Sequence, residues 1–117
     1  MTKDESIRPW GSYEILLDSD ECKVKRIFVS PNQRLSYQYH QHREEFWTIV
    51  QGSALATVNN KEVSLSIGDQ IHVPIKAKHR IANTSSETLI FIEIQLGTYF
   101  GEDDIVRIED DYNRTSQ

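Results

Sequence analysis

The fold of this chain is constrained above all by a succession of short segments in which apolar and polar residues alternate. Each segment is rich in β-branched or aromatic side chains and is bounded by turn-forming residues, which is typical of β-strands. The segments span residues 23–30, 34–42, 46–50, 53–58, 62–67, 70–74, 79–83 and 88–96. Asn59 and Asn60 predict a hairpin turn, because asparagine tolerates positive φ angles. Strands without intervening helices favour an antiparallel sandwich or barrel.

Length and charge limit the organisation and the partners. The 117 residues predict one domain over 1–117, with roughly 1–6 and 113–117 loosely ordered. Six of the 18 acidic residues but only two of the 13 basic residues follow Gly101, so 12 acids face 11 bases in the rest of the chain. Because the sequence has no basic stripe, we do not expect a nucleic-acid partner.

The sequence also predicts a soluble cytoplasmic protein with no membrane partner. Its first residues are polar, and the longest aliphatic stretch, LIFIEI, is interrupted by Glu93. The single cysteine, Cys22, cannot form an internal disulfide, so nothing in the sequence demands an oxidising compartment.

Three histidines and a glutamate form a candidate metal-binding set. His40 and His42 lie two residues apart in a predicted strand, where side chains two apart point to the same face. Glu45 follows closely, with Glu44 as an alternative ligand, and His79 comes from another predicted strand. Imidazole and carboxylate ligands suit one divalent transition metal ion, namely zinc, manganese, iron, cobalt or nickel.

These residues lie in two stretches that match a known pair of motifs. HQHREEFWTIVQG resembles the first cupin motif, and GDQIHVPIKAKHRIAN resembles the second, although Lys76 stands where the pattern usually has glycine. The resemblance implies an all-β double-stranded β-helix, the cupin or jelly-roll barrel. His72 alternates with apolar neighbours, so we expect it to face outward.

A closer resemblance covers nearly the whole chain. RPWGSYEIL, RLSYQYHQHREEFW, HRIAN and IEIQLGTYFGEDDIVRIEDDYNR resemble the C-terminal cupin domain of type II mannose-6-phosphate isomerases, which is usually fused to a mannose-1-phosphate guanylyltransferase. The chain departs from this family at Phe46, where histidine is frequent, and at Asn32 and Asn113, where glycine is common.

The resemblance implies a metal-dependent sugar-phosphate isomerase that interconverts mannose 6-phosphate and fructose 6-phosphate through an enediolate. Such a reaction needs a proton-transfer group, stabilisation of developing negative charge and a phosphate anchor. Glu93 and Arg80 are the expected catalytic residues. The residues expected to bind the substrate are Arg8, Arg34, Arg43, Gln38 and Gln95.

Several alternatives remain open at this point. Glu93 can instead orient a ligand imidazole, and the arginines can pair with Glu102, Asp103 and Asp104. The alternative functions are a non-catalytic cupin that binds a sugar phosphate or nucleotide sugar, and an iron dioxygenase.

The expected partners are a small-molecule sugar phosphate, a separate nucleotidyltransferase and a second copy of the chain. Leu35, Tyr37 and Tyr39 share the strand face opposite to the ligands, where they would leave apolar surface exposed unless another sheet covered it. The sequence therefore predicts a two-fold homodimer, in the setting of carbohydrate metabolism and polysaccharide biosynthesis.

Overall fold

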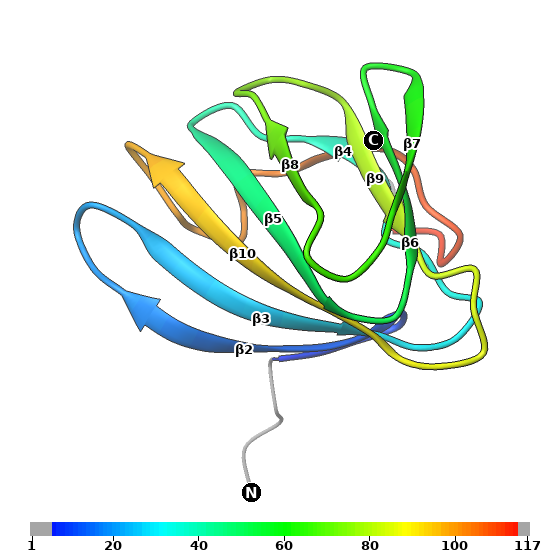
Figure 1. Ribbon diagram of the computed structural model, residues 1–117. Helices are drawn as coiled ribbons and strands as arrows, with labels where there is room; N and C mark the ends of the chain where they lie inside the picture. The colour runs from blue at the N-terminus through cyan, green and yellow to red at the C-terminus, as the bar shows by residue number, and fades with distance from the viewer. Residues whose placement is uncertain (1–5, 115–117) are drawn as a thin grey trace, which may run out of the picture.

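The computed structural model describes residues 6–114, which form two antiparallel β-sheets that face each other (Figure 1). One sheet has the strand order β1-β2-β3-β10-β5-β8 and the other has the order β11-β4-β9-β6-β7. The strands are β1 (Ile7–Arg8), β2 (Gly11–Asp18), β3 (Lys23–Val29), β4 (Tyr37–Tyr39), β5 (Arg43–Gln51), β6 (Ala54–Val58), β7 (Lys61–Leu65), β8 (Gln70–Val73), β9 (His79–Ala82), β10 (Leu89–Gly97) and β11 (Val106–Glu109). This arrangement confirms the predicted all-β double-stranded β-helix.

Each of the eight predicted segments overlaps a strand, and three further strands in residues 6–114 were not predicted. The missed strands are β1, β2 and β11. No helix occurs in residues 6–114, and so none there could span a membrane. Most of the predicted loose ends lies outside the described residues, but Arg114 is described and its guanidinium forms an ion pair with Asp110 at 2.7 Å.

Residues that stand in place of glycine adopt the backbone conformation that glycine favours. Lys76, Asn32 and Asn113 have φ angles of 68°, 62° and 59°, all in the left-handed region. The predicted hairpin turn between β6 and β7 is confirmed, with φ angles of 50° at Asn59 and 68° at Asn60. The replacement of glycine at these three positions therefore leaves the backbone conformation of the turns unchanged.

The interior of the barrel is apolar at one end and polar at the other. In β10, Leu89 and Phe91 are fully buried beside apolar residues of β3 and β5, whereas Glu93 and Gln95 are buried two and four residues further along. The partners change in step, because Phe91 pairs with Ile27 of β3 and Glu93 pairs with Lys25. The apolar end supplies the hydrophobic core. The polar end requires hydrogen-bond and charge partners, and the candidate site lies there.

Candidate metal centre and cationic pocket

The chain changes its strand phase between β4 and β5, and this change decides which side chains enter the barrel. His40 is buried, Gln41 and His42 are exposed at the bend that follows, and Arg43 and Glu45 are buried again. A continuous strand would have turned His42 inward. Because β4 ends at Tyr39, the alternation does not extend to His42, and Arg43 enters the barrel instead.

Three of the four predicted metal ligands come together inside the barrel. His40 Nε2 lies 3.2 Å from Glu45 Oε2, and His79 Nε2 lies 3.8 Å from Glu45 Oε1. One possible ligand atom from each residue lies within 4.8 Å of the others. The structure does not bring His42 to this group: its ring lies edge-on to Tyr99, 6.3 Å between centroids. The group also selects Glu45 over Glu44.

Hydrogen bonds to backbone carbonyls orient both imidazoles of this group. His40 Nδ1 lies 2.5 Å from the carbonyl oxygen of Asp104, and His79 Nδ1 lies 2.9 Å from that of Ala77. A carbonyl oxygen only accepts, so each Nδ1 is the donor and carries the proton. In the neutral form of each ring, Nε2 is thereby the nitrogen that keeps a lone pair, and it is directed at the group, as a metal-binding histidine requires.

Arg43 is part of the same cluster. Its Nε donates to Glu45 Oε2 at 2.9 Å, and its Nη2 lies 2.8 Å from the same oxygen and 3.3 Å from His40 Nε2. Its Nη1 is buried without a hydrogen-bond partner among the described residues. A buried, partly unsatisfied guanidinium favours an anion nearby.

Trp47 connects the metal-binding group to a second buried carboxylate. The indole Nε1 lies 3.1 Å from both Glu45 Oε1 and Glu93 Oε1, and Gln95 Nε2 donates to Glu93 Oε2 at 2.7 Å. Glu93 is thus connected to Glu45 by the shared indole N–H of Trp47. A residue that helps to orient Glu45 would lie in this position.

The buried charges shift one another's protonation. Burial opposes the ionisation of Glu45, but His40, Arg43 and His79 hold its pKa well below the usual value. Burial lowers the pKa of His79 to about 4, against the attraction of Glu45. Burial, and then the charge of Glu45, raise the pKa of Glu93 to about 7. At neutral pH the group thus offers an ionised carboxylate and a neutral imidazole.

These donors fit a divalent transition metal. Two Nε2 atoms and one ionised carboxylate, with the second nitrogen of each ring already hydrogen-bonded, are the ligand and supporting sets that zinc, manganese, iron, cobalt and nickel accept. Three protein ligands also leave positions for a further molecule. The residues present therefore fit a metal ion in this place.

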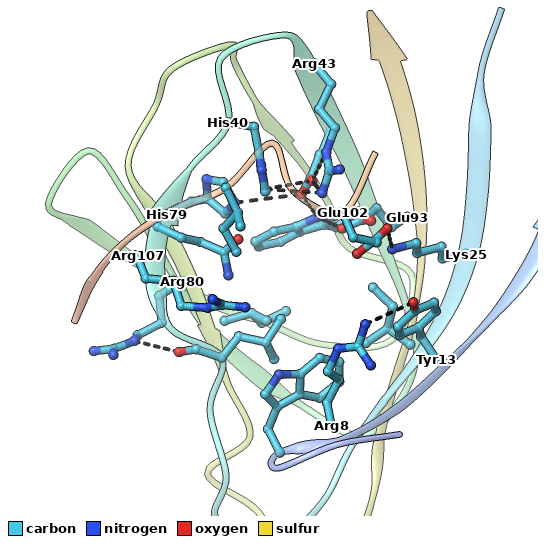
Figure 2. Close-up of a pocket in the computed structure, with 18 of the residues that line it drawn as sticks. Arg8, Tyr13, Lys25, His40, Arg43, His79, Arg80, Glu93, Glu102 and Arg107 are labelled. Atoms are coloured by element: carbon cyan, nitrogen blue, oxygen red, sulfur yellow. Dashed lines mark hydrogen bonds and ion pairs between the residues drawn. The ribbon is translucent and has the colours of Figure 1, made fainter. Parts of the chain in front are cut away.

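The metal-binding group opens onto a pocket rich in positive charge (Figure 2). Six cationic side chains line it, against three carboxylates, Glu45, Glu93 and Glu102. The cations are Arg8, Lys25, Arg43, Arg80, Arg107 and Arg114. Figure 2 shows Arg8 across the pocket from His40 and Arg43. The excess of cations makes the pocket suitable for a multiply charged anion.

Sequence reasoning missed three of these cations, Lys25, Arg107 and Arg114. Burial lowers the pKa of Arg107, and repulsion by Arg114 and Arg8 adds to this. Its Nε is also buried without a hydrogen-bond partner among the described residues. In β11 it is Arg107, rather than Val106 or Ile108, that turns inward. No signal in the sequence predicts this reversal, because such a strand normally buries its aliphatic residues.

The predicted substrate-binding residues divide into those that reach the pocket and those that do not. Arg8, Arg43, Gln38 and the predicted catalytic pair Arg80 and Glu93 all line it. Arg34 does not: its side chain is 45 % exposed, and its Nε and Nη2 donate to the carboxylate of Asp111. It fails because β4 begins only at Tyr37, so alternation does not reach back to Arg34. Gln95 is fully buried behind Glu93.

Phe46, His72 and Glu44 lie together on the outer face of the sheet that contains β5 and β8. Phe46 is on the outer face of β5, where its ring stacks on His72 with the centroids 4.6 Å apart. His72 Nε2 also lies 2.6 Å from Glu44. All three point away from the metal-binding group, so the replacement of a frequent histidine by Phe46 removes nothing from it.

Curated proteins similar to this chain belong to sugar metabolism. The chain is 44% identical over 113 residues to the "Alginate biosynthesis protein AlgA" of Pseudomonas aeruginosa, covering 97% of this chain and 24% of that protein. It is 42% identical over 105 residues to a "Mannose-1-phosphate guanylyltransferase" of Sinorhizobium fredii, covering 90% of this chain and 20% of that protein. The chain thus spans about a quarter or less of the length of these relatives.

A solved structure shows the same fold. The chain resembles an uncharacterised conserved protein with a double-stranded β-helix domain from Klebsiella pneumoniae, with a TM-score of 0.75 and 22% identity. The match covers 91% of this chain and 93% of that one. At this identity the likeness shows the cupin fold alone.

The comparisons correct the function expected from the sequence. We expected a mannose-6-phosphate isomerase, with a non-catalytic sugar-binding cupin or an iron dioxygenase as alternatives. The relatives at 42% to 44% identity are instead named for guanylyl transfer to mannose 1-phosphate and for alginate biosynthesis, and neither alternative matches these names better. The error arose because a metal-binding set and a fold permit many reactions, and so do not select one.

Family membership rests on sequence and fold together. Residues 1–110 match the family described as "Mannose-6-phosphate isomerase C-terminal", a name that describes a domain and its place in longer proteins. The two facing sheets are those of the cupin fold that the solved structure shares. This chain therefore belongs to the mannose-6-phosphate isomerase C-terminal family of cupin domains.

Proposed function

We propose that this chain is a metal-binding component of a mannose-1-phosphate guanylyltransferase system, in which it takes up the phosphorylated sugar. The observation that carries this proposal is that the His40–Glu45–His79 group and a cation-rich wall line one pocket. The names of relatives that match more than nine tenths of this chain point to the same chemistry.

The metal-binding group supports the first half of this proposal. One divalent transition metal ion would be held by His40, Glu45 and His79, with Gln38 close by on the same wall. When bound, such an ion supplies a Lewis acid that polarises sugar or phosphate oxygens. Trp47 and Glu93 hold the Glu45 carboxylate in place from behind.

The cationic wall supports the second half. A phosphate carries about two negative charges and several strong acceptor oxygens, which arginine forks match in geometry. Arg107 and Arg43 each have a buried nitrogen without a hydrogen-bond partner among the described residues, and these two are the strongest candidates for anchors. Arg8 and Arg80 line the same pocket and add positive charge.

The expected protein partners are a separate nucleotidyltransferase and a second copy of the chain. Guanylyl transfer requires a nucleotide site, which we assign to the nucleotidyltransferase. The apolar surface expected at Leu35, Tyr37 and Tyr39 is partly covered within the chain, since all three residues are half-buried and Leu35 lines the pocket.

The surface for a homodimer is better assigned to the outer face of the other sheet. That face exposes large apolar side chains of β5 and β10, namely Phe46, Val50, Ile94 and Leu96. Ile94→Lys should give a monomer in light scattering, where the unmodified chain gives a dimer. A monomeric unmodified chain would exclude the dimer.

Calorimetric titration tests the proposed function. The chain should bind one equivalent of Zn²⁺ or Co²⁺, and the loaded chain should bind mannose 1-phosphate more tightly than mannose. Glu45→Gln should abolish metal binding. Arg107→Gln should keep it and weaken mannose 1-phosphate by about 10-fold or more, the loss expected for a charge-assisted hydrogen bond.

A matched control is His72→Gln, which changes an exposed histidine on the outer face and should alter neither affinity. Equal affinities for mannose and mannose 1-phosphate would contradict the proposal. So would the lack of any metal binding at millimolar concentration.

A further inference from the structure

The segment that joins β10 to β11, residues 98–105, crosses from one sheet to the other (Figure 1). It contacts the candidate metal site through Asp104 and His40. We call it the crossing segment. It is fixed at its start by a hydrogen bond from the Thr98 amide to the His42 carbonyl at 3.0 Å. In its middle, Glu102 lies 2.6 Å from the buried Lys25 and 3.5 Å from Lys23.

Asp104, near the end of the crossing segment, makes three contacts with the turn that carries His40. Its Oδ1 accepts from the Gln41 amide and its Oδ2 from the His42 amide, both at 3.0 Å. Its carbonyl oxygen accepts from His40 Nδ1 at 2.5 Å. The side chain is buried, and although burial opposes ionisation, the two amide hydrogen bonds keep the pKa of Asp104 below its usual value.

The contacts of Asp104 stabilise the turn between β4 and β5, where the inward–outward alternation shifts by one residue. At Gln41 and His42 the sheet ladder is interrupted, and the Asp104 carboxylate takes up the two amides that are left there. The same residue then offers its carbonyl to His40. His79 differs, because its Nδ1 partner, Ala77, is only two residues away. Only His40 depends on a contact 64 residues distant in the sequence.

We propose that Asp104 is a positioning residue of the metal site: its carboxylate fixes the turn at residues 40–42, so that its carbonyl holds the His40 ring with Nε2 directed at Glu45 and His79. This rests on the proposed metal binding. Because Thr98 and Glu102 hold the crossing segment independently, loss of the Asp104 carboxylate should disturb the His40 ring without releasing the segment.

The test compares Asp104→Ala with Asp103→Ala in the full chain. Asp103 is the adjacent exposed aspartate, whose Oδ1 accepts from the Tyr99 hydroxyl and not from the turn. Nuclear magnetic resonance of the ring nitrogens, without metal and at a pH at which His40 is neutral, should show His40 as a single tautomer protonated at Nδ1 in the unmodified chain and in Asp103→Ala. In Asp104→Ala the His40 signals should become those of mixed tautomers, while His79 stays unchanged.

Co²⁺ affinity provides the second measurement. Asp104→Ala should lower it by about 10- to 100-fold, the usual effect of removing a residue that supports a metal ligand. Asp104→Asn keeps the size and one acceptor oxygen, so its affinity should lie between those of Asp104→Ala and the unmodified chain.

The role of Asp104 is overturned if the His40 tautomer is unchanged in Asp104→Ala, whatever the affinity does. It is also overturned if His79 changes as much as His40, because the effect would then be general. If the unmodified chain does not bind Co²⁺ at all, the proposed metal binding fails, whereas the ring-nitrogen spectra still test Asp104.

Discussion

At the scale of single residues, the site depends on a one-residue shift in the inward–outward alternation of side chains between β4 and β5. His40 and Arg43 enter the barrel, although strict alternation would have paired His40 with His42. The outcome replaces an imidazole by a guanidinium that contacts both His40 and Glu45. The two histidines of the H-x-H pattern are thus not equivalent.

This difference predicts opposite results for two alanine substitutions. His40→Ala should weaken Zn²⁺ binding by more than about 100-fold, beyond the effect of changing a supporting residue, because it removes a ligand. His42→Ala should leave the affinity within about twofold, since its ring lies against Tyr99. Titration calorimetry measures both, and equal losses would show that His42 is a ligand after all.

A second residue-scale prediction concerns Asp110 near the C-terminus. Its carboxylate accepts from the amide, Nε and Nη2 of Arg114. Burial opposes ionisation, but Arg114 lowers the pKa of Asp110. The stabilisation should therefore be complete above the ordinary aspartate pKa of about 4 and be lost as the pH falls through the lower value of the folded state.

Asp110→Asn should accordingly lower the free energy of unfolding by about 1 kcal/mol at pH 7. The difference from the unmodified chain should shrink below about pH 4. Urea unfolding at several pH values measures it, with Asp20→Asn at an exposed site as the control. A difference that grows towards acid pH would give the opposite sign and refute the assignment.

The sequence could predict which residues form the buried candidate group, but not the place of every residue. His40, Glu45 and His79 were predictable because two motifs fix them relative to turns, and Lys76 keeps the left-handed φ of its turn. The expected inward orientation of His42 was wrong because the end of a strand depends on pairing, and β4 pairs with β9 through a single register position.

At the scale of elements, β10 organises the barrel. It lies between β3 and β5 and passes from the apolar end to the polar end. Near its end, a Cβ on Gly97 would lie 2.1 Å from the His42 carbonyl oxygen and 2.7 Å from Arg43 Cα. The close approach of β10 and β5 at the site thus requires a residue without a side chain.

Gly97→Ala should therefore separate the two strands where Arg43 enters the barrel. Overpacking of this kind costs about 1–3 kcal/mol, and the free energy of unfolding should fall by that amount. Chemical denaturation measures it, with Ser64→Ala on the exposed part of β7 as the control. An unchanged stability would mean that the strand ends move apart at no cost.

The elements that the sequence did not predict lack a correct alternation signal. Strand β2 contains Ile15, Leu16 and Leu17 in succession, each about half exposed, so no face of it reads as buried. Strand β11 turns Arg107 inward and leaves Val106 and Ile108 exposed, which reverses the usual pattern. Their pairing with β3 and β4 decides their structure, and pairing partners are not visible in one sequence.

At the scale of the whole molecule, the candidate metal ligands come from both sheets. Glu45 belongs to β5 in one sheet, whereas His79 belongs to β9 in the other and His40 directly follows β4. A bound ion would thus connect the two sheets at the end of the barrel that has no apolar core. Metal binding should therefore stabilise the entire fold.

We expect the chain with Zn²⁺ at about 100 times its dissociation constant to be more stable by about 2.7 kcal/mol than the chain with chelator. For a domain of this size the Tm should rise by about 10 °C. Differential scanning calorimetry measures the change, and Glu45→Gln should show no metal-dependent rise. A Tm independent of metal in the unmodified chain would exclude a connection between the sheets.

The division of the interior has an evolutionary consequence. In β3, β5 and β10 the inward side chains of one half of the strand form the hydrophobic core, and those of the other half are polar or charged. Phe91 and Glu93 are the neighbouring inward residues at which β10 changes from one kind to the other. Related barrels can therefore accept substitutions among the polar inward residues while they keep the same hydrophobic core. The core residues and the site residues can thus change at different rates in evolution.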